Sequence, residues 1–431
     1  MSTLRSRRHV VALALLSGLV SCTEPSAPVP VPTIAISISR GADWFAYRND
    51  GGEWTSLAPS ASGAYEFLAT PRVAVAWAIN QAGVVPNLSV AYTTAESFRE
   101  EAARLARGSA TSIVYTGTAN GVARNIPTGA FWAYIGHGPN MDNITGASAA
   151  STNFSLLTWS APMDLVATLV SSADSSRGIS MGVRAILRRG QRLSPGSAVT
   201  LDFDSPEFFP LGTATLAWTG PELGVEVEFI SATGSRALLS RVQRTLSDKA
   251  LLARTRVVSR MPPERLVPGD LHQLQFGDQS SNSQRVTTRW THTLADTELD
   301  LGPAPLAPTV TLASSGANSR PRFVTPARAE LGDYVIAVAE QQGTIPGTAF
   351  IGRLHSVTVL VTKGYLGVTP DAWTLEVPGL RRVAGFPSAV LLASGGFSWT
   401  VYASGGNCAT CADSVFDGRV ERRWSVGDTV R

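Results

Sequence analysis

Stretches in which apolar and polar residues alternate dominate the sequence from residue 33 onward. Residues 34–39 alternate isoleucine with alanine and serine, and residues 225–229 alternate valine or phenylalanine with glutamate. A period of two residues gives an extended strand one apolar face and one polar face. Glycine, proline, asparagine and serine separate these stretches at short intervals. The pattern therefore predicts an all-β protein with many short strands.

A hairpin is predicted near the beginning of this β-rich region. The aromatic stretch Trp44–Tyr47 is followed by the turn residues Asn49–Gly52 and then by Trp54. Asp-Gly and Gly-Gly pairs supply the positive φ angles that tight hairpin turns require. We therefore expect the two aromatic segments to pair as neighbouring antiparallel strands.

Only one segment has clear helical spacing, between Thr94 and Arg107. Thr93 and Glu96 match a capping box, and Gly108 is suited to end the helix. An apolar stripe with helical period follows the cap and contains Phe98, Ala102, Leu105 and Ala106. The sequence thus predicts one short helix at the end of a first β domain.

The strand candidates fall into three groups that we interpret as domains. A small β domain with its terminal helix is expected over 33–108, a β-sandwich over 109–255, and a second sandwich over 256–431. Strands at this spacing with turn residues between them favour sandwiches. The expected architecture is therefore two to three β-sandwich-like domains with one short helix after the first.

The first 21 residues have the layout of a secretory signal peptide. A basic beginning that contains Arg7 and Arg8 precedes the apolar run Val10–Val20. A helix of that length rises about 16 Å, about half the thickness of a bilayer core. The run is therefore typical of a signal peptide that is removed, and not of a stable membrane span.

The signal ends in the sequence Leu19-Val20-Ser21-Cys22, which resembles the lipobox of bacterial lipoproteins. In that family the chain is cut before the cysteine, and the cysteine carries a diacylglyceryl group and a further fatty acid such as palmitate. The resemblance implies lipidation of Cys22, and two or more acyl chains make a firm membrane anchor. The alternative is an ordinary signal peptide followed by a chance cysteine.

Residues 22–32 contain four prolines and predict an extended tether between the lipid and the first domain. Thr23 follows the lipidated position. In Gram-negative lipoproteins aspartate at that position retains the protein in the inner membrane, so the resemblance implies residence in the outer membrane. The chain also resembles lipoproteins of unassigned activity from high-GC Gram-negative bacteria, because Lys249 and Lys363 are its only lysines.

The middle domain resembles transthyretin-like sandwiches of the carboxypeptidase-regulatory type. The resemblance rests on Phe154–Leu157 and on Asp164–Thr168, which match the rhythm of the closing strands of that family. It covers about thirty residues and carries no catalytic residue. Domains of this kind have structural or binding roles.

Charge argues against nucleic acid as a partner. The net charge of +3 comes from the signal peptide, whose three arginines are unaccompanied by acidic residues; removing them from 36 basic residues leaves 33 against 33 acidic ones. Without a basic field, a protein loses the main electrostatic contribution to nucleic-acid binding. The expected partners are the membrane, through the lipid anchor, and a glycan or protein ligand.

The sequence contains neither the His-Glu-x-x-His motif of zinc proteases nor a Walker sequence. No catalytic residue, metal ligand or cofactor is assigned. His137 lies between two glycines in a predicted loop, with Asp142 close behind. A histidine in that setting can approach a ligand, and the alternative is a turn histidine in solvent. Asp202 and Asp204 flank Phe203 and are expected on the solvent side of a strand.

Cys408 and Cys411 have C-x-x-C spacing without the histidine that haem attachment requires or a second pair that zinc requires. Glycines precede the pair and strands flank it. In an oxidising envelope we expect a small structural disulfide in a hairpin loop.

These observations favour a lipid-anchored protein of the cell envelope with a binding or structural role and without enzymatic activity. One alternative is a carbohydrate-binding or adhesive surface protein, which a row of exposed tryptophans would support. A second is a hydrolase with an unrecognised site, which a deep pocket that joins His137 to carboxylates would support.

Overall fold

The structure is a computed structural model. Most of the chain after residue 32 is described, in the following ranges: 33–39, 42–81, 85–99, 115–127, 131–138, 141–145, 151–174, 179–242, 252–280, 282–302, 306–314, 319–344, 351–368, 370–393, 395–407 and 416–430. Strands dominate these residues and form sandwich-like sheets, which confirms the all-β prediction. None of the described helices has the length and apolar character that crossing a bilayer requires.

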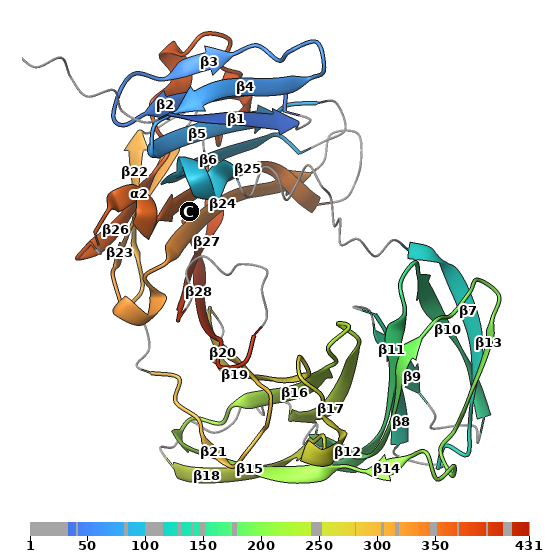
Figure 1. The fold of residues 1–431 in the computed structure, drawn as a ribbon. Coiled ribbons are helices and arrows are strands. Elements are labelled where there is room, and N and C mark those ends of the chain that lie inside the picture. The colour runs from blue at the N-terminus through green and yellow to red at the C-terminus, as the bar shows by residue number, and fades with distance from the viewer. Residues whose placement is uncertain are drawn as a thin grey trace, which may run out of the picture. The chain divides into compact units, whose positions relative to one another are not determined.

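The largest sheet is a continuous ladder of hydrogen-bonded strands (Figure 1). Neighbours in it are antiparallel except for β25 and β6, which are parallel. In pairing order the strands are β9 (Met141–Thr145), β8 (Phe131–His137), β11 (Met163–Asp174), β12 (Ile179–Gln191), β17 (Arg236–Val242), β16 (Gly224–Ile230), β19 (Leu271–Gln279), β20 (Ser283–Thr291), β28 (Val420–Val430), β27 (Phe397–Gly406), β24 (Tyr334–Thr344), β25 (Ile351–Thr362), β6 (Asn87–Thr94), β5 (Arg72–Ile79), β2 (Trp44–Asn49) and β3 (Thr55–Leu57), with β14 (Phe209–Pro210) beside β12.

Four small sheets accompany the ladder. They are β1 (Ile34–Ser39) with β4 (Ala64–Ala69); β10 (Ser151–Trp159), β7 (Tyr115–Arg124) and β13 (Ala198–Asp202); β18 (Leu252–Arg260), β15 (Gly212–Gly220) and β21 (Thr297–Glu298); and β22 (Thr309–Ser314), β23 (Arg320–Pro326) and β26 (Ala372–Glu376). Short helical turns connect the strands: η2 (Pro263–Arg265), η3 (Ala329–Leu331), α2 (Lys363–Leu366), η4 (Leu380–Arg382) and η5 (Ser388–Val390).

Each small sheet packs against part of the ladder and encloses its own apolar core. The β7 sheet and strands β8, β11 and β12 enclose one core, and the β15 sheet encloses another with β16, β17 and β19. Strand β11 contributes to both cores, because Leu165 faces the first and Val166 the second. This explains why residues 163–170 are all buried although a strand exposes alternate faces.

Segments from the two ends of the described chain share a third core. Trp44, Leu88 and Val90 pack in one cluster with Val359 and Trp373. Strands β6 and β25 pair in parallel at the centre of this cluster, with Val90 opposite Val359. The N-terminal strands therefore complete the sheet of the C-terminal strands, a pairing that alternation along the sequence did not predict.

The second expected domain boundary falls inside a strand. Residue 255 lies within β18, which pairs along its whole length with β15. The ladder likewise continues from β16 to β19 across this position. Strand pairing thus joins the segments on both sides of residue 255.

The predictions of a hairpin after Trp44 and of a helix near Thr94 agree closely with the structure. Strands β2 and β3 form the expected hairpin, with φ of 32° at Asp50 and 82° at Gly51. The helix begins at residue 95, and its described part covers 95–99. Its cap is Thr94, whose hydroxyl oxygen accepts the Ser97 N–H at 3.2 Å, and not Thr93 as expected. Thr93 is unsuitable because it is still a buried residue of β6.

Candidate ligand-binding face

The predicted ligand residue His137 is buried at the end of β8. It is only 1% exposed, and its Nδ1 and Nε2 atoms lie 2.9 Å and 3.3 Å from the carbonyl oxygens of Leu157 and Gln191. Both ring nitrogens are therefore occupied by backbone, and the expectation of a loop histidine open to a ligand is wrong. Asp142 lies on β9, where its backbone pairs with Ile135.

The glycines beside His137 serve packing. A β-carbon at Gly136 would overlap the carbonyl oxygen of Arg236, and one at Gly138 would overlap the indole of Trp159. Gly138 also has a φ of 88°, which disfavours other residues. The glycine-flanked histidine thus arises from close approach of β8 to its neighbours.

Asp202 forms no ligand site with its described neighbours, and the three cysteines cannot be placed. Asp202 ends β13 and accepts a hydrogen bond of 2.7 Å from the Asn125 side chain, which lowers the pKa of Asp202, while Phe203 packs in the core. Cys22, Cys408 and Cys411 lie outside the described residues. Among the described residues, no three His, Cys, Asp or Glu side chains gather to hold a metal ion.

All ten tryptophans are described, and every one is buried or half-buried. Among the residues whose exposure is described, the exposed aromatic ones are Tyr115, Tyr402 and Phe416, with Tyr402 44% exposed. A row of exposed tryptophans, which would have favoured a stacking platform for sugars, is therefore absent from this structure's described residues. Tyr402 nevertheless lies on the surface described next.

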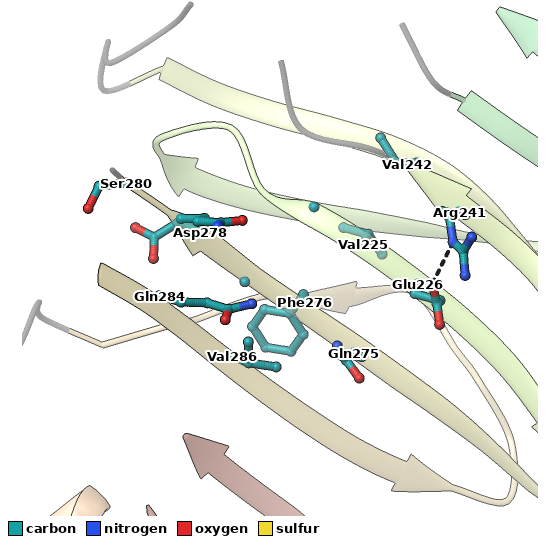
Figure 2. A pocket seen from close by; sticks show the side chains of 13 residues that line it. Val225, Glu226, Arg241, Val242, Gln275, Phe276, Asp278, Ser280, Gln284 and Val286 are labelled. Atoms are coloured by element: carbon teal, nitrogen blue, oxygen red, sulfur yellow. Dashed lines mark hydrogen bonds and ion pairs between the residues drawn. The ribbon is translucent and has the colours of Figure 1, made fainter. Parts of the chain in front are cut away.

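A hollow of about 780 Å³ lies over four neighbouring strands of the ladder, β17, β16, β19 and β20. Figure 2 shows Gln275 and Gln284 on adjacent strands, with Glu226 and Arg241 at one side. A second hollow of about 520 Å³ continues over β20, β28, β27 and β24 and shares Gln275, Gln284 and Val286 with the first. We call the two hollows together the polar face.

Cross-strand pairing explains why polar residues gather there. One row of paired positions across the strands contains Arg241, Glu226, Gln275, Thr288 and Glu421. A second contains Gln279, Gln284, Ser425, Tyr402 and Ile336. Residues paired directly across neighbouring strands project from the same side of the sheet. Each row therefore presents a line of mostly polar side chains that crosses several strands; the second row ends at the apolar Ile336.

Every charged side chain that lines the polar face has a partner of opposite charge. Arg241 donates from Nε to Glu226 at 2.6 Å, and Arg285 holds Asp278 through two hydrogen bonds, one of 2.9 Å. Arg423 donates to Glu421 at 2.6 Å. The charged lining residues are two acidic and two basic ones, so the face carries no net charge.

Several neutral polar side chains on the face have no hydrogen-bond partner among the described residues. Gln275, Gln284 and Tyr402 are exposed and make no side-chain hydrogen bond to another described residue, and neither do Thr288 and Ser425. Amides and hydroxyls both donate and accept hydrogen bonds. The face therefore offers unused neutral donors and acceptors beside satisfied charges.

A buried carboxyl, that of Glu228, lies beside the lining residue Glu226. Burial and the neighbouring Glu226 carboxyl, to which it is hydrogen-bonded, raise the pKa of Glu228, while Arg236 at 3.3 Å opposes this shift. Burial also raises the pKa of Tyr134, which lies near Glu226 and Arg241. Because Glu228 is only 6% exposed, its carboxyl does not face a ligand, whereas Glu226 lines the hollow.

A hydrogen-bonded network fixes the strands that carry the face. Asp270, which directly precedes β19, is fully buried and receives two hydrogen bonds from the Arg189 guanidinium. Arg189 also donates to Asp164 at 2.8 Å, and His292 donates from Nδ1 to the Asp270 carbonyl at 2.8 Å. These contacts tie β19 and β20 to β11 and β12.

His272 extends this network within β19. Its Nε2 accepts the Met261 N–H at 3.0 Å, so the ring proton sits on Nδ1 and is donated to the His292 carbonyl. Burial lowers the pKa of His272 to about 4, so the ring is neutral at pH 7.

Sequence reasoning missed the polar face because its residues are unremarkable along the chain. Along the sequence, Gln275 and Gln284 are ordinary solvent-facing positions of two separate strands. Only the pairing of β19 with β20 brings them onto one surface. Glutamine at alternate positions 273, 275 and 279 is the one local signal. Comparison with models of known protein families and with curated protein sequences finds no match.

Proposed function

We propose that this chain is a lipid-anchored protein of the cell envelope that binds an extended polar ligand on the polar face. The observation that carries the binding role is the row of unpartnered amides and hydroxyls beside fully paired charges. A carbohydrate-binding or adhesive role is a special case of this proposal.

The anchor is supported by the sequence Leu19–Cys22 and by the proline-rich segment 22–32. We expect the mature protein to begin at Cys22, with a diacylglyceryl group and a fatty acid on that residue. Mass spectrometry of the N-terminal peptide tests this, and membrane fractionation of a Gram-negative source tests outer-membrane residence. A soluble product that begins elsewhere, or an unmodified Cys22, would contradict the anchor.

The proposed disulfide between Cys408 and Cys411 is compatible with this location. It would close a short loop and contribute less than the roughly 3 kcal/mol expected for a fifteen-residue loop. Mass spectra recorded with and without reduction distinguish a paired from a free state. A mass shift of a thiol label on both cysteines before reduction would contradict the pairing.

The binding role predicts that wild-type protein retains material from its own envelope through the polar face. The double variant Gln275→Ala/Gln284→Ala should lose that material, because both amides are exposed and their removal leaves the fold intact. The full chain is immobilised, incubated with a solubilised envelope extract, and the eluate is analysed for carbohydrate and for protein. Equal retention by the wild type and the double variant would contradict binding at this face.

A matched control is Gln342→Ala. Gln342 is also an exposed glutamine in a strand of the ladder, but it lines neither hollow. Its variant should retain the same material as the wild type. Unchanged melting temperatures of all three proteins separate loss of binding from loss of folding.

A further inference from the structure

We infer that the ligand of the polar face is a neutral, hydroxyl-rich polysaccharide that lies across the strands. This inference rests on the proposed function, since it names the chemical class of the ligand for the same site.

Charge is the first observation that selects this class. Both basic lining residues are already engaged, Arg241 by Glu226 and Arg423 by Glu421. Each pair is balanced in charge, so neither an anionic nor a cationic polymer would gain a net electrostatic attraction to the face. An uncharged ligand leaves all the ion pairs intact and uses the free amides and hydroxyls instead.

Strand pairing argues against a peptide that adds to the sheet. Each of β16, β19, β20, β28 and β27 is hydrogen-bonded to a neighbour on both sides. Strand addition requires a free edge with unpaired backbone groups. The polar face therefore recognises its ligand through side chains alone, which suits the hydroxyl groups of a sugar chain.

The extent of the face favours a polymer over a single sugar. The two hollows are continuous through Gln275, Gln284 and Val286 and cross seven paired strands. At a strand spacing of about 4.8 Å, seven strands span about 29 Å along the sheet. Successive units of one chain can therefore contact successive side chains in each row.

Tyr402 supplies an aromatic surface in the second hollow. Its side chain is exposed and stands between Ser425 and Ile336 in the second row. An exposed phenol ring can pack against the apolar face of a sugar while its hydroxyl stays in water. This residue supplies the stacking contact that the buried tryptophans cannot provide.

The test uses the full chain in detergent and defined polysaccharides as probes. Neutral probes are amorphous cellulose, β-1,3-glucan, mannan and dextran, and charged probes are polygalacturonate and chitosan. We expect retention on at least one neutral polymer and tighter binding of its longer oligomers. Binding should persist in about 1 M salt, where the Debye length falls to about 3 Å, because no ion pair with the ligand is involved.

Variants of the face give the expected size of the effect. Gln275→Ala/Gln284→Ala should weaken binding about ten-fold, since two neutral hydrogen bonds are lost. Tyr402→Ala should weaken it about five-fold, and Tyr402→Phe should retain most of the affinity. The matched controls are Gln342→Ala and Tyr115→Ala, the latter removing a tyrosine that is 52% exposed outside the face.

The possible outcomes separate this inference from the proposed function. Suppose that the protein is retained only on a charged polymer, that salt abolishes this retention, and that it depends on Gln275 and Gln284. The inference of a neutral ligand would then be wrong, but the proposed binding role of the face would stand. A protein ligand that depends on the same glutamines would also overturn the inference alone. If none of the neutral polymers retains the protein, the inference is wrong. If the immobilised protein also retains nothing from the envelope extract, the proposed function is wrong as well.

Discussion

Replacing Arg189 by methionine is expected to lower the free energy of unfolding by about 3–5 kcal/mol. The guanidinium pairs with Asp164 and Asp270, whose side chains are 4% and 0% exposed. Methionine fills similar volume but leaves both buried carboxylates without their counter-charge. The loss is measured by urea unfolding at pH 7, with tryptophan fluorescence as the signal.

The neighbouring Arg188 provides a matched control. It lies on the same strand and pairs with Glu207 at 2.6 Å, but that carboxylate is 51% exposed. Solvent screening limits such a pair to about 1 kcal/mol at most, so Arg188→Met should be close to the wild type. Equal losses in the two variants would contradict the role assigned to Arg189.

A second substitution covers the case in which Arg189→Met does not fold. Arg189→Lys keeps the positive charge but cannot hold Asp270 with two parallel hydrogen bonds. It should fold with an intermediate loss of stability. Because Asp270 directly precedes β19, either variant that folds should also bind the ligand of the polar face more weakly than the wild type.

Local structure followed from the sequence where neighbouring residues decide it. The hairpin at Asp50 and Gly51 formed as predicted, because its turn depends on φ angles that only a few residues adopt. The start of the helix was predicted to within one residue for a similar reason. Thr94 and Ser97 satisfy the cap through their own short-range hydrogen bonds.

Strand partners could not be predicted in the same way. An alternating strand specifies which side is apolar, but not which other strand will cover that side or pair with its edge. Val90 and Val359 lie in ordinary apolar stretches, and nothing in either stretch indicates their parallel pairing. This pairing joins β6, which lies in the expected domain over 33–108, to a strand more than 250 residues later.

The prediction that His137 lies in an open loop was wrong for a related reason. Glycine beside His137 suggested an open loop, but glycine is also required where two backbones approach closely, as at Gly136 and Arg236. Sequence alone does not distinguish these two uses of glycine. The polar face could not be predicted because its polar residues, such as Gln275 or Ser425, are ordinary polar positions on strands whose other side is buried.

Acid is expected to destabilise the protein through His272. Burial lowers the pKa of this ring to about 4 in the folded state, whereas an unfolded histidine has a pKa of about 6.5. Between these values the unfolded chain binds a proton that the folded chain does not, so stability falls as the pH decreases from 6.5 to 4. At about 1.4 kcal/mol for each pKa unit, the loss by pH 4 is about 3 kcal/mol.

The variant His272→Asn isolates this contribution from the carboxylates that titrate in the same range. Its amide can accept from Met261 and donate to His292 but takes up no proton. We therefore expect lower stability than the wild type at pH 7 and a flatter decline between pH 6.5 and pH 4. Urea unfolding at half-unit pH intervals gives both curves.

The control for this experiment is a variant that is destabilised without losing a titrating group. Leu274→Ala removes a buried side chain from the same strand and should cost about 2–5 kcal/mol at every pH. Its pH dependence should therefore run parallel to that of the wild type. If His272→Asn also runs parallel to the wild type, the neutral buried imidazole is not the origin of the acid sensitivity.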